Sequence, residues 1–80
     1  MFVHSTAYVS KTAEISEGTI VEPKAVVNIE TVIGAGCIIS VGSVVDYNVV
    51  LQVFVYVNAG AIVNAGAIVN AGTLVENGRK

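Results

Sequence analysis

Side chains that could do chemistry are few in this 80-residue chain, which holds one histidine, His4, and one cysteine, Cys37. A protein-bound transition metal needs several converging imidazole, thiolate or carboxylate ligands. His4 alone cannot supply such a set, so the sequence predicts no metal site and places His4 at a solvent-facing corner near the start of the fold. Cys37 has no histidine or acidic residue near it in sequence. We therefore expect Cys37 to pack as a small apolar side chain rather than to act as a nucleophile.

Acidic side chains are concentrated in the first third of the sequence, where two lysines accompany them: Lys11, Glu14, Glu17, Glu22, Lys24 and Glu30. Two of these carboxylates could form an acid–base pair, or several could bind a cation. The alternative is a rim of solvated charge, which is where most charged side chains lie in folded proteins. We expect the solvated rim. Between Thr31 and Val75 the only charged side chain is Asp46.

Composition and charge exclude several classes of partner. Nucleic-acid binding needs clustered Lys and Arg to neutralise phosphates, but the net charge is −2 and the four basic residues are scattered: Lys11, Lys24, Arg79 and Lys80. We therefore expect no nucleic-acid partner. No apolar run of about 18 residues and no secretory signal pattern occurs, which predicts no membrane partner and a cytoplasmic location. Only 12% of the residues are charged, against about 25% in an average domain, and this favours self-association.

The element that must position these side chains is a repeat of six residues. Neither a helix, with its period of about 3.6, nor a single strand, with its period of about 2, gives a period of six. Such a period arises when short strands and corners alternate at fixed length, as in a solenoid. From Val3 to Val75 every sixth residue is a branched aliphatic: Val3, Val9, Ile15, Val21, Val27, Ile33, Ile39, Val45, Leu51, Val57, Val63, Val69 and Val75.

Each hexad reads as a short strand followed by a corner. The residue two before the aliphatic one is usually small, and the residue between them is usually β-branched or aromatic. This is typical of a strand with two inward side chains and one outward side chain between them. The other three positions read Asn-Ala-Gly at 58–60, 64–66 and 70–72. Gly and Asn tolerate the positive φ that a sharp corner needs.

One corner per hexad predicts a three-sided coil of about 18 residues, and thirteen hexads make about four coils. The expected fold class is therefore all-β, a single-stranded parallel β-helix shaped as a three-sided prism, with residues 1–80 as one domain. Stacked coils place equivalent positions above one another. The expected inner columns are Val9, Val27, Val45 and Val63; Ile15, Ile33, Leu51 and Val69; and Val21, Ile39, Val57 and Val75.

The pattern [V/I/L]-x-x-G-[A/T/S/C]-x over residues 3–80 resembles the hexapeptide-repeat superfamily. The resemblance implies a left-handed parallel β-helix, and the hand comes from it alone. Within the superfamily, HSTAYVS at 4–10 is similar to the start of the β-helix in sialic-acid and bacillosamine-type sugar O- and N-acetyltransferases. IGAGCII at 33–39 and GSVVD at 42–46 continue in the same style. This resemblance implies a homotrimer that takes acetyl from acetyl-CoA, with a catalytic histidine in a corner between subunits.

At the positions that match the family's catalytic stretch, residues 43–49 read SVVDYNV. Tyr47 stands where the family has its catalytic histidine, Asn48 where it has the acidic partner, and Tyr56 where it has a second histidine. A general base needs a pKa near the working pH, whereas a free tyrosine has a pKa of about 10. We therefore assign no catalytic residue, no cofactor-binding residue and no cofactor. Acetyl-CoA would be the cofactor only if another residue replaces the histidine.

The outward positions are expected to form apolar columns of their own. Such columns mark interfaces, although β-branched residues also occur on strands for their propensity alone. We expect at least one face to be buried in a homotrimer, with Tyr47 and the column of Asn28, Asp46 and Asn64 near the interface. The expected outer columns are Val26, Val44 and Ile62; Val32, Val50 and Ile68; and Ile20, Ile38, Tyr56 and Leu74.

The sequence therefore predicts a structural, self-assembling trimeric scaffold without catalytic activity. Two alternatives stay open. One is an acetyl-CoA-dependent sugar acetyltransferase with a non-standard site. The other is a binding module that uses a flat outer face, although the regular ranks of threonine that would favour it are absent.

Two further features bear on origin and on the coil ends. Residues 58–63 and 64–69 are both NAGAIV, which indicates either an engineered, regularised sequence or a recent duplication in a decayed enzyme. A solenoid leaves a bare strand edge at each end unless something caps it. We expect Met1 and Phe2 to cover the first coil, and Arg79 and Lys80 to discourage end-to-end stacking.

Overall fold

The structure is a computed structural model that describes residues 1–78. Within this range the chain forms thirteen two-residue strands and no helix, so it has no helix that could cross a membrane. The strands are β1 (Phe2–Val3), β2 (Tyr8–Val9), β3 (Glu14–Ile15), β4 (Ile20–Val21), β5 (Val26–Val27), β6 (Val32–Ile33), β7 (Ile38–Ile39), β8 (Val44–Val45), β9 (Val50–Leu51), β10 (Tyr56–Val57), β11 (Ile62–Val63), β12 (Ile68–Val69) and β13 (Leu74–Val75).

The strands stack into three parallel sheets. Sheet A has the order β1-β4-β7-β10-β13, sheet B the order β2-β5-β8-β11, and sheet C the order β3-β6-β9-β12. Phe2 pairs with Ile20 and Val3 with Val21, so one coil takes about 18 residues. The three-sided prism of about four coils that the sequence predicts is therefore confirmed.

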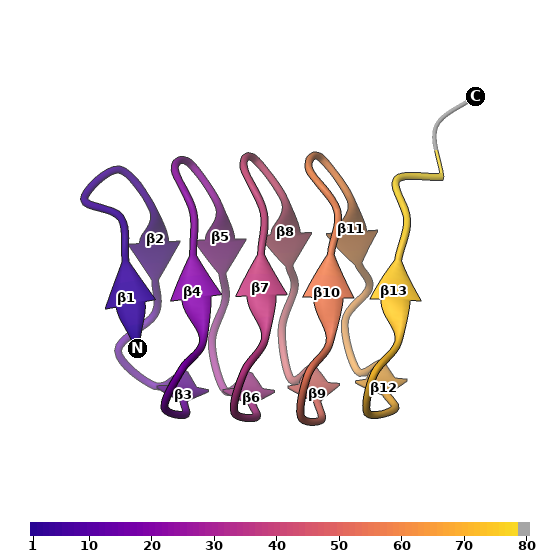
Figure 1. Ribbon diagram of the computed structural model, residues 1–80. Coiled ribbons are helices and arrows are strands. Elements are labelled where there is room, and N and C mark those ends of the chain that lie inside the picture. Colours follow the sequence, from indigo (N-terminus) through magenta and orange to yellow (C-terminus); the bar gives the residue numbers. More distant parts are fainter. Residues whose placement is uncertain (79–80) are drawn as a thin grey trace.

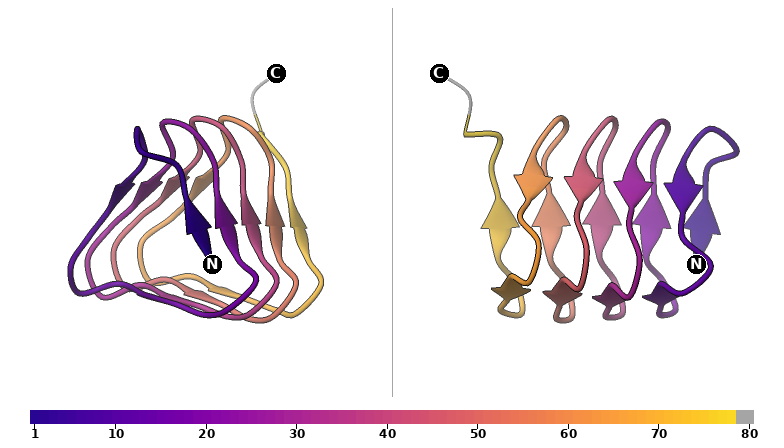
Figure 2. Two further views of the ribbon diagram at one scale, coloured as in Figure 1. Left: turned by 60° about the vertical axis from the view of Figure 1, so that its left-hand side comes forward. Right: turned by 180° about the vertical axis from the view of Figure 1, so that it is seen from behind.

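The hand of the coil follows from the path between the sheets. Sheet A lies nearest the viewer with its strands pointing up, sheet B lies behind with its strands pointing down, and sheet C runs along the bottom (Figure 1). Seen from the N-terminal side, the chain turns counterclockwise as it recedes (Figure 2, left). The solenoid is therefore left-handed, opposite to the usual hand of crossovers between parallel strands.

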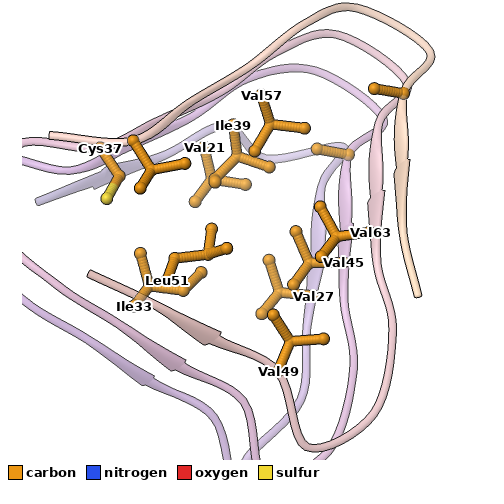
Figure 3. Packing of buried hydrophobic residues seen from close by; sticks show 13 residues of the cluster. Val21, Val27, Ile33, Cys37, Ile39, Val45, Val49, Leu51, Val57 and Val63 are labelled. Carbon is orange, nitrogen blue, oxygen red and sulfur yellow. The ribbon is translucent and has the colours of Figure 1, made fainter. Parts of the chain in front are cut away.

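The inside of the prism is filled by the predicted aliphatic columns, whose side chains meet from the three sheets (Figure 3). In the middle coils these residues are fully buried. In the end coils the equivalent residues are only partly buried, because a neighbouring coil is present on one side only: Val3, Val9, Ile15, Val69 and Val75. Burial of aliphatic side chains is the main stabilising term available to this fold.

Buried hydroxyl groups tie successive coils together beside the aliphatic columns. Thr19 Oγ1 donates to Gly34 O at 2.7 Å and accepts from Cys37 N at 3.0 Å. Thr31 makes the same kind of link at another corner, where its Oγ1 donates to Asp46 O at 2.8 Å. Because both threonines are fully buried, their hydrogen bonds replace solvation that the folded chain has lost.

Every corner between residues 18 and 72 turns through a residue in the left-handed region, whereas Thr6 and Thr12 fill the same slot without a positive φ. Glycine fills this slot at six positions, as predicted, but Lys24, Glu30, Asn48 and Phe54 also occupy it with φ between 56° and 62°. Such a conformation costs a non-glycine residue about 1–2 kcal/mol. A hydrogen bond to the preceding coil offsets part of this cost, as when Phe54 N donates to Ala35 O at 2.9 Å.

The expectation that Met1 and Phe2 cover the first coil is wrong. Phe2 is the outward residue of β1, stacks beside Ile20 in sheet A, and is 57% exposed. The hexad register decides this, because the residue before an inward aliphatic faces solvent. Arg79 and Lys80, expected at the other end, lie outside the described residues.

Close packing between coils makes Gly34 sensitive to any side chain. A Cβ on Gly34 would lie 2.9 Å from Gln52 C and from Val53 N in the next coil. Gly34→Ala is therefore expected to lower the free energy of unfolding by about 1–3 kcal/mol, the usual cost of overpacking. The control is Gly42→Asn, because Gly42 has open space around its Cβ position and asparagine tolerates its positive φ. Equal losses for the two variants in guanidinium unfolding would contradict the packing argument.

The two hydrogen bonds of the Thr19 hydroxyl group predict that its removal destabilises the fold. Thr19→Val keeps the shape but removes both hydrogen bonds, so it is expected to lower the free energy of unfolding by about 2–3 kcal/mol. Thr73→Val is the matched control, because Thr73 fills the same slot of the hexad in the last coil but is exposed. Its effect is expected to stay within about 0.5 kcal/mol. A comparable effect for both variants in urea unfolding would argue against the buried bonds.

Candidate functional site

The corner between β8 and β9 holds the residues that match the family's catalytic stretch. Asp46 Oδ1 accepts from Tyr47 N at 2.9 Å and from Asn28 Nδ2 at 3.3 Å. The carboxylate therefore closes the corner and links it to the preceding coil. The Tyr47 side chain is half exposed, and neither of these hydrogen bonds involves its hydroxyl group.

Backbone geometry explains why position 48, next to Tyr47, holds an asparagine. Asn48 has a φ of 56°, and asparagine is one of the residue types that tolerate this region. Its N–H donates to Ile29 O at 3.0 Å in the preceding coil. Asn48 therefore serves the corner turn, and it carries no charge that could orient a base.

Tyr56 lies far around the prism from Tyr47. It is the outward residue of β10 in sheet A, whereas Tyr47 sits at the corner that joins sheets B and C. The corner between β8 and β9 and strand β10 lie on different sides of the prism (Figure 1). The positions that match the family site therefore form no single site in the subunit.

His4 takes part in the first corner. Its Nδ1 accepts from Thr6 N at 3.1 Å and lies 2.9 Å from Thr6 Oγ1. Its ring also stands edge-on to Phe2, with ring centroids 6.5 Å apart. The predicted corner position is confirmed, although these contacts leave the side chain partly buried. The imidazole stabilises a turn.

The acidic residues of the first third lie at different places around the prism. Glu14 faces outward on sheet C, and Glu17 lies at the corner between sheets C and A. Glu22 lies at the corner between sheets A and B, and Glu30 at the corner between sheets B and C. The four carboxylates are therefore distributed over one face and three corners of the prism. Among residues 1–78 no three His, Cys, Asp or Glu side chains lie close enough together to hold a metal ion.

Cys37 is fully buried, as predicted. Its Sγ donates to Gln52 O at 3.1 Å. Thr19, one coil earlier in the same column, makes the equivalent bond to Gly34 O. The thiol therefore replaces a hydroxyl group in the interior, and no base or charged group activates it in the part of the chain that the structure describes.

A hollow at the corner between sheets A and B was not predicted. Its volume is about 490 Å³, and its lining consists of Glu22, Ser40, Val41, Tyr56, Asn58, Ala59, Glu76 and Asn77. Within the described residues, Ser40 Oγ is buried without a hydrogen-bond partner. The signal in the sequence is the regular spacing of Glu22, Ser40, Asn58 and Glu76, one coil apart in each case, which places them in one corner column.

The chemistry open to this hollow is limited. Its polar groups are oxygens and amides, which suit water, hydroxyl groups or a hard cation. Glu22 and Glu76 are three coils apart, so their backbones are separated by about 14 Å at ~4.8 Å per coil. Glu22 and Glu76 therefore stand at the two ends of the hollow, with Ser40 and Asn58 between them.

Comparison with known proteins gives no assignment: no protein-family model and no curated protein matches the chain. What the structure shows is the parallel β-solenoid itself. The resemblance to sugar acetyltransferases stays a prediction from the sequence.

Because Cys37 is buried, its thiol is expected to react slowly with thiol reagents. In the native protein Cys37 is expected to react with a thiol reagent only when the solenoid opens, more than about a hundredfold slower than an exposed cysteine. Ala65→Cys supplies the matched exposed thiol in the same molecule, because Ala65 lies at a solvent-facing corner. Spectroscopic titration is expected to show one fast and one slow thiol. Two fast thiols would contradict the buried position.

Proposed function

We propose that the protein is a structural scaffold that assembles as a homotrimer through the outer face of sheet C. The observation that carries the proposal is the apolar character of this face in the middle coils. Val32, Val50 and Ile68 point outward from β6, β9 and β12, and all three are exposed. An apolar face of this kind on a small domain marks an interaction surface.

The corners on both sides of sheet C extend the apolar surface. Ile29 and Tyr47 are exposed at the corner with sheet B, and Val53 and Phe54 are exposed at the corner with sheet A. At the corner between sheets A and B, Val41 is the one large apolar side chain that is exposed among the described residues. Sheet C has two exposed apolar side chains at each of its corners, and this supports it as the contact surface.

The two corners that flank sheet C form two different apolar edges of the subunit, and this arrangement suits a closed ring of subunits. A contact that joins one edge of a subunit to the other edge of its neighbour is heterologous, and such contacts close into rings when the rotation permits. A ring of three agrees with the resemblance to trimeric acetyltransferases. We propose that a second copy of this chain covers the face of sheet C, because both of the edges that would meet belong to this chain.

Phe54 supports the corner with sheet A as part of the contact. It is 69% exposed and has a φ of 59°, which is unusual for a bulky residue. The six glycines show that the same slot accepts a residue without a side chain. Strained residues of this kind cluster at sites that bind or switch. The ring of Phe54 is well placed to pack against a neighbouring subunit.

Trimerisation is expected at micromolar concentration, with a mass about three times the 8.2 kDa of the chain. Phe54→Asn is expected to shift the association to about tenfold higher concentration, a change of about 2.8 kcal/mol per trimer because the dissociation constant of a trimer scales with the square of the concentration. The fold is expected to remain because asparagine suits the positive φ. Val41→Ser, at the corner between sheets A and B, is the matched control. Sedimentation equilibrium measures both. A wild-type protein that stays monomeric at these concentrations would overturn the proposal.

Enzyme assays test the absence of catalysis. Acetyl-CoA turnover with amino-sugar acceptors, above a control without protein, would contradict the proposal that the protein is a scaffold without catalytic activity. The variant Tyr47→His with Asn48→Asp restores the two residue types of the family site. Activity in this variant alone would show that the trimer still forms the site geometrically and that the substitutions removed its chemistry.

A further inference from the structure

One column of polar side chains has hydrogen-bonding capacity that the fold does not use. It runs along the corner between sheets A and B, at the first corner position of successive coils, and lines the hollow described above: Glu22, Ser40, Asn58 and Glu76. Within residues 1–78 the structure shows no hydrogen bond or ion pair to any of these side chains.

The equivalent columns at the other two corners are bonded. At the corner between sheets B and C, Asn28 Nδ2 donates to Asp46 Oδ1 at 3.3 Å. At the corner between sheets C and A, Gln52 Oε1 accepts from Ala71 N at 3.1 Å. Most polar side chains of folded proteins find partners in this way. The unused capacity is therefore specific to the corner that carries the hollow.

Ser40 indicates that the hollow takes a ligand. Its side chain follows the inward Ile39, so it points away from the interior and toward the hollow that it lines (Figure 3). Ser40 is nevertheless only 4% exposed, and its Oγ is buried without a partner in the described part of the chain. A buried hydroxyl group without a hydrogen bond costs free energy, and a polar group held in the hollow would remove that cost.

We propose that the hollow binds a linear polyamine whose ammonium groups lie along the column, one per coil. Ionised carboxylates such as Glu22 and Glu76 only accept hydrogen bonds, and the Ser40 hydroxyl and the Asn58 amide carry acceptors between them. An ammonium group has donors, no acceptor and a positive charge. It is therefore complementary to every member of the column, and the net charge of −2 also attracts cations.

The spacing of the coils favours an extended ligand over a single ion. Neighbouring residues of the column are about 4.8 Å apart. Two amines joined by three carbons lie about 5 Å apart when extended, because each bond is about 1.5 Å long. A polyamine with three-carbon spacers therefore stays in step with the coils. A metal ion needs converging ligands, and among residues 1–78 no three His, Cys, Asp or Glu side chains converge.

The same spacing argues against a basic peptide in the hollow. Side chains on one face of an extended peptide recur at every second residue, about 7 Å apart, which is out of step with the coils. The hollow also offers apolar surface from Val41, Tyr56 and Ala59. This surface suits the methylene groups between the amines, since binding sites combine apolar walls with a few polar groups.

NMR titration of the 80-residue chain at low salt tests the proposal with three probes that each carry four amines. They are a linear tetraamine with three-carbon spacers, one with six-carbon spacers, and a blocked tetralysine peptide. The first is expected to bind with a Kd of about 1 mM, because exposed charge pairs are individually weak. The other two are expected to bind at least about fivefold more weakly. Absence of saturable binding up to about 20 mM would overturn the proposal, and so would tighter binding of the peptide.

Charge variants locate the site. The double variant Glu22→Gln with Glu76→Gln is expected to raise the Kd of the three-carbon tetraamine about tenfold, because two charge pairs are lost. The matched control is Glu14→Gln with Glu17→Gln, which removes the same charge from sheet C and from its corner with sheet A. The control is expected to change the Kd less than about twofold. Equal losses would show attraction to the net charge alone and would overturn the site.

Ser40→Ala separates ligand binding from folding. The Ser40 hydroxyl has no partner in the described structure, so its removal is expected to leave the free energy of unfolding of the ligand-free protein undiminished. The Kd of the three-carbon tetraamine is expected to rise about tenfold, because a hydrogen bond to a charged group is lost. Reduced stability with unchanged affinity would show that the hydroxyl serves the fold and would overturn the assignment. The corner lies away from the face of sheet C, so this proposal and the trimer can fail separately.

Discussion

Every coil of this protein depends on the coil beside it, because two-residue strands have too few hydrogen bonds to be stable alone. The constant register between successive coils is the constraint that makes the stack possible. It places aliphatic residues above aliphatic residues inside the prism and lets each backbone N–H reach a carbonyl in the next coil. A one-residue shift would exchange inward and outward side chains along a whole column.

The sequence predicted the fold because its signal is repeated thirteen times. The period of six, the inner columns and the buried position of Cys37 all follow from side-chain volume and polarity at fixed spacing. The left-handed conformation of Lys24, Glu30 and Phe54 could not be predicted, because their residue types disfavour it. The slot in the hexad does not decide it either, since Thr6 and Thr12 fill the same slot without a positive φ. The error about Met1 and Phe2 came from treating the chain end as a cap instead of as the first hexad.

The candidate site was harder to predict than the fold. Motif matching singled out Tyr47, Asn48 and Tyr56, but a linear motif does not show that two of them lie on different sides of the prism. The hollow beside Glu22 and Glu76 escaped notice because its lining comes from residues three coils apart. In a solenoid, neighbours in space are separated in sequence by whole coils, so a search for short motifs cannot find such a cluster.

The uniform length of the hexads has a consequence for how this molecule can change in length. Because each hexad turns the chain through one third of a coil, one inserted hexad would move every later side chain to the next face of the prism while keeping it inward or outward. The core would tolerate such an insertion, but the outer faces would not keep their composition. Only a step of three hexads preserves both. The interior and the surface of this protein therefore have different rules for growth, and the surface has the stricter one.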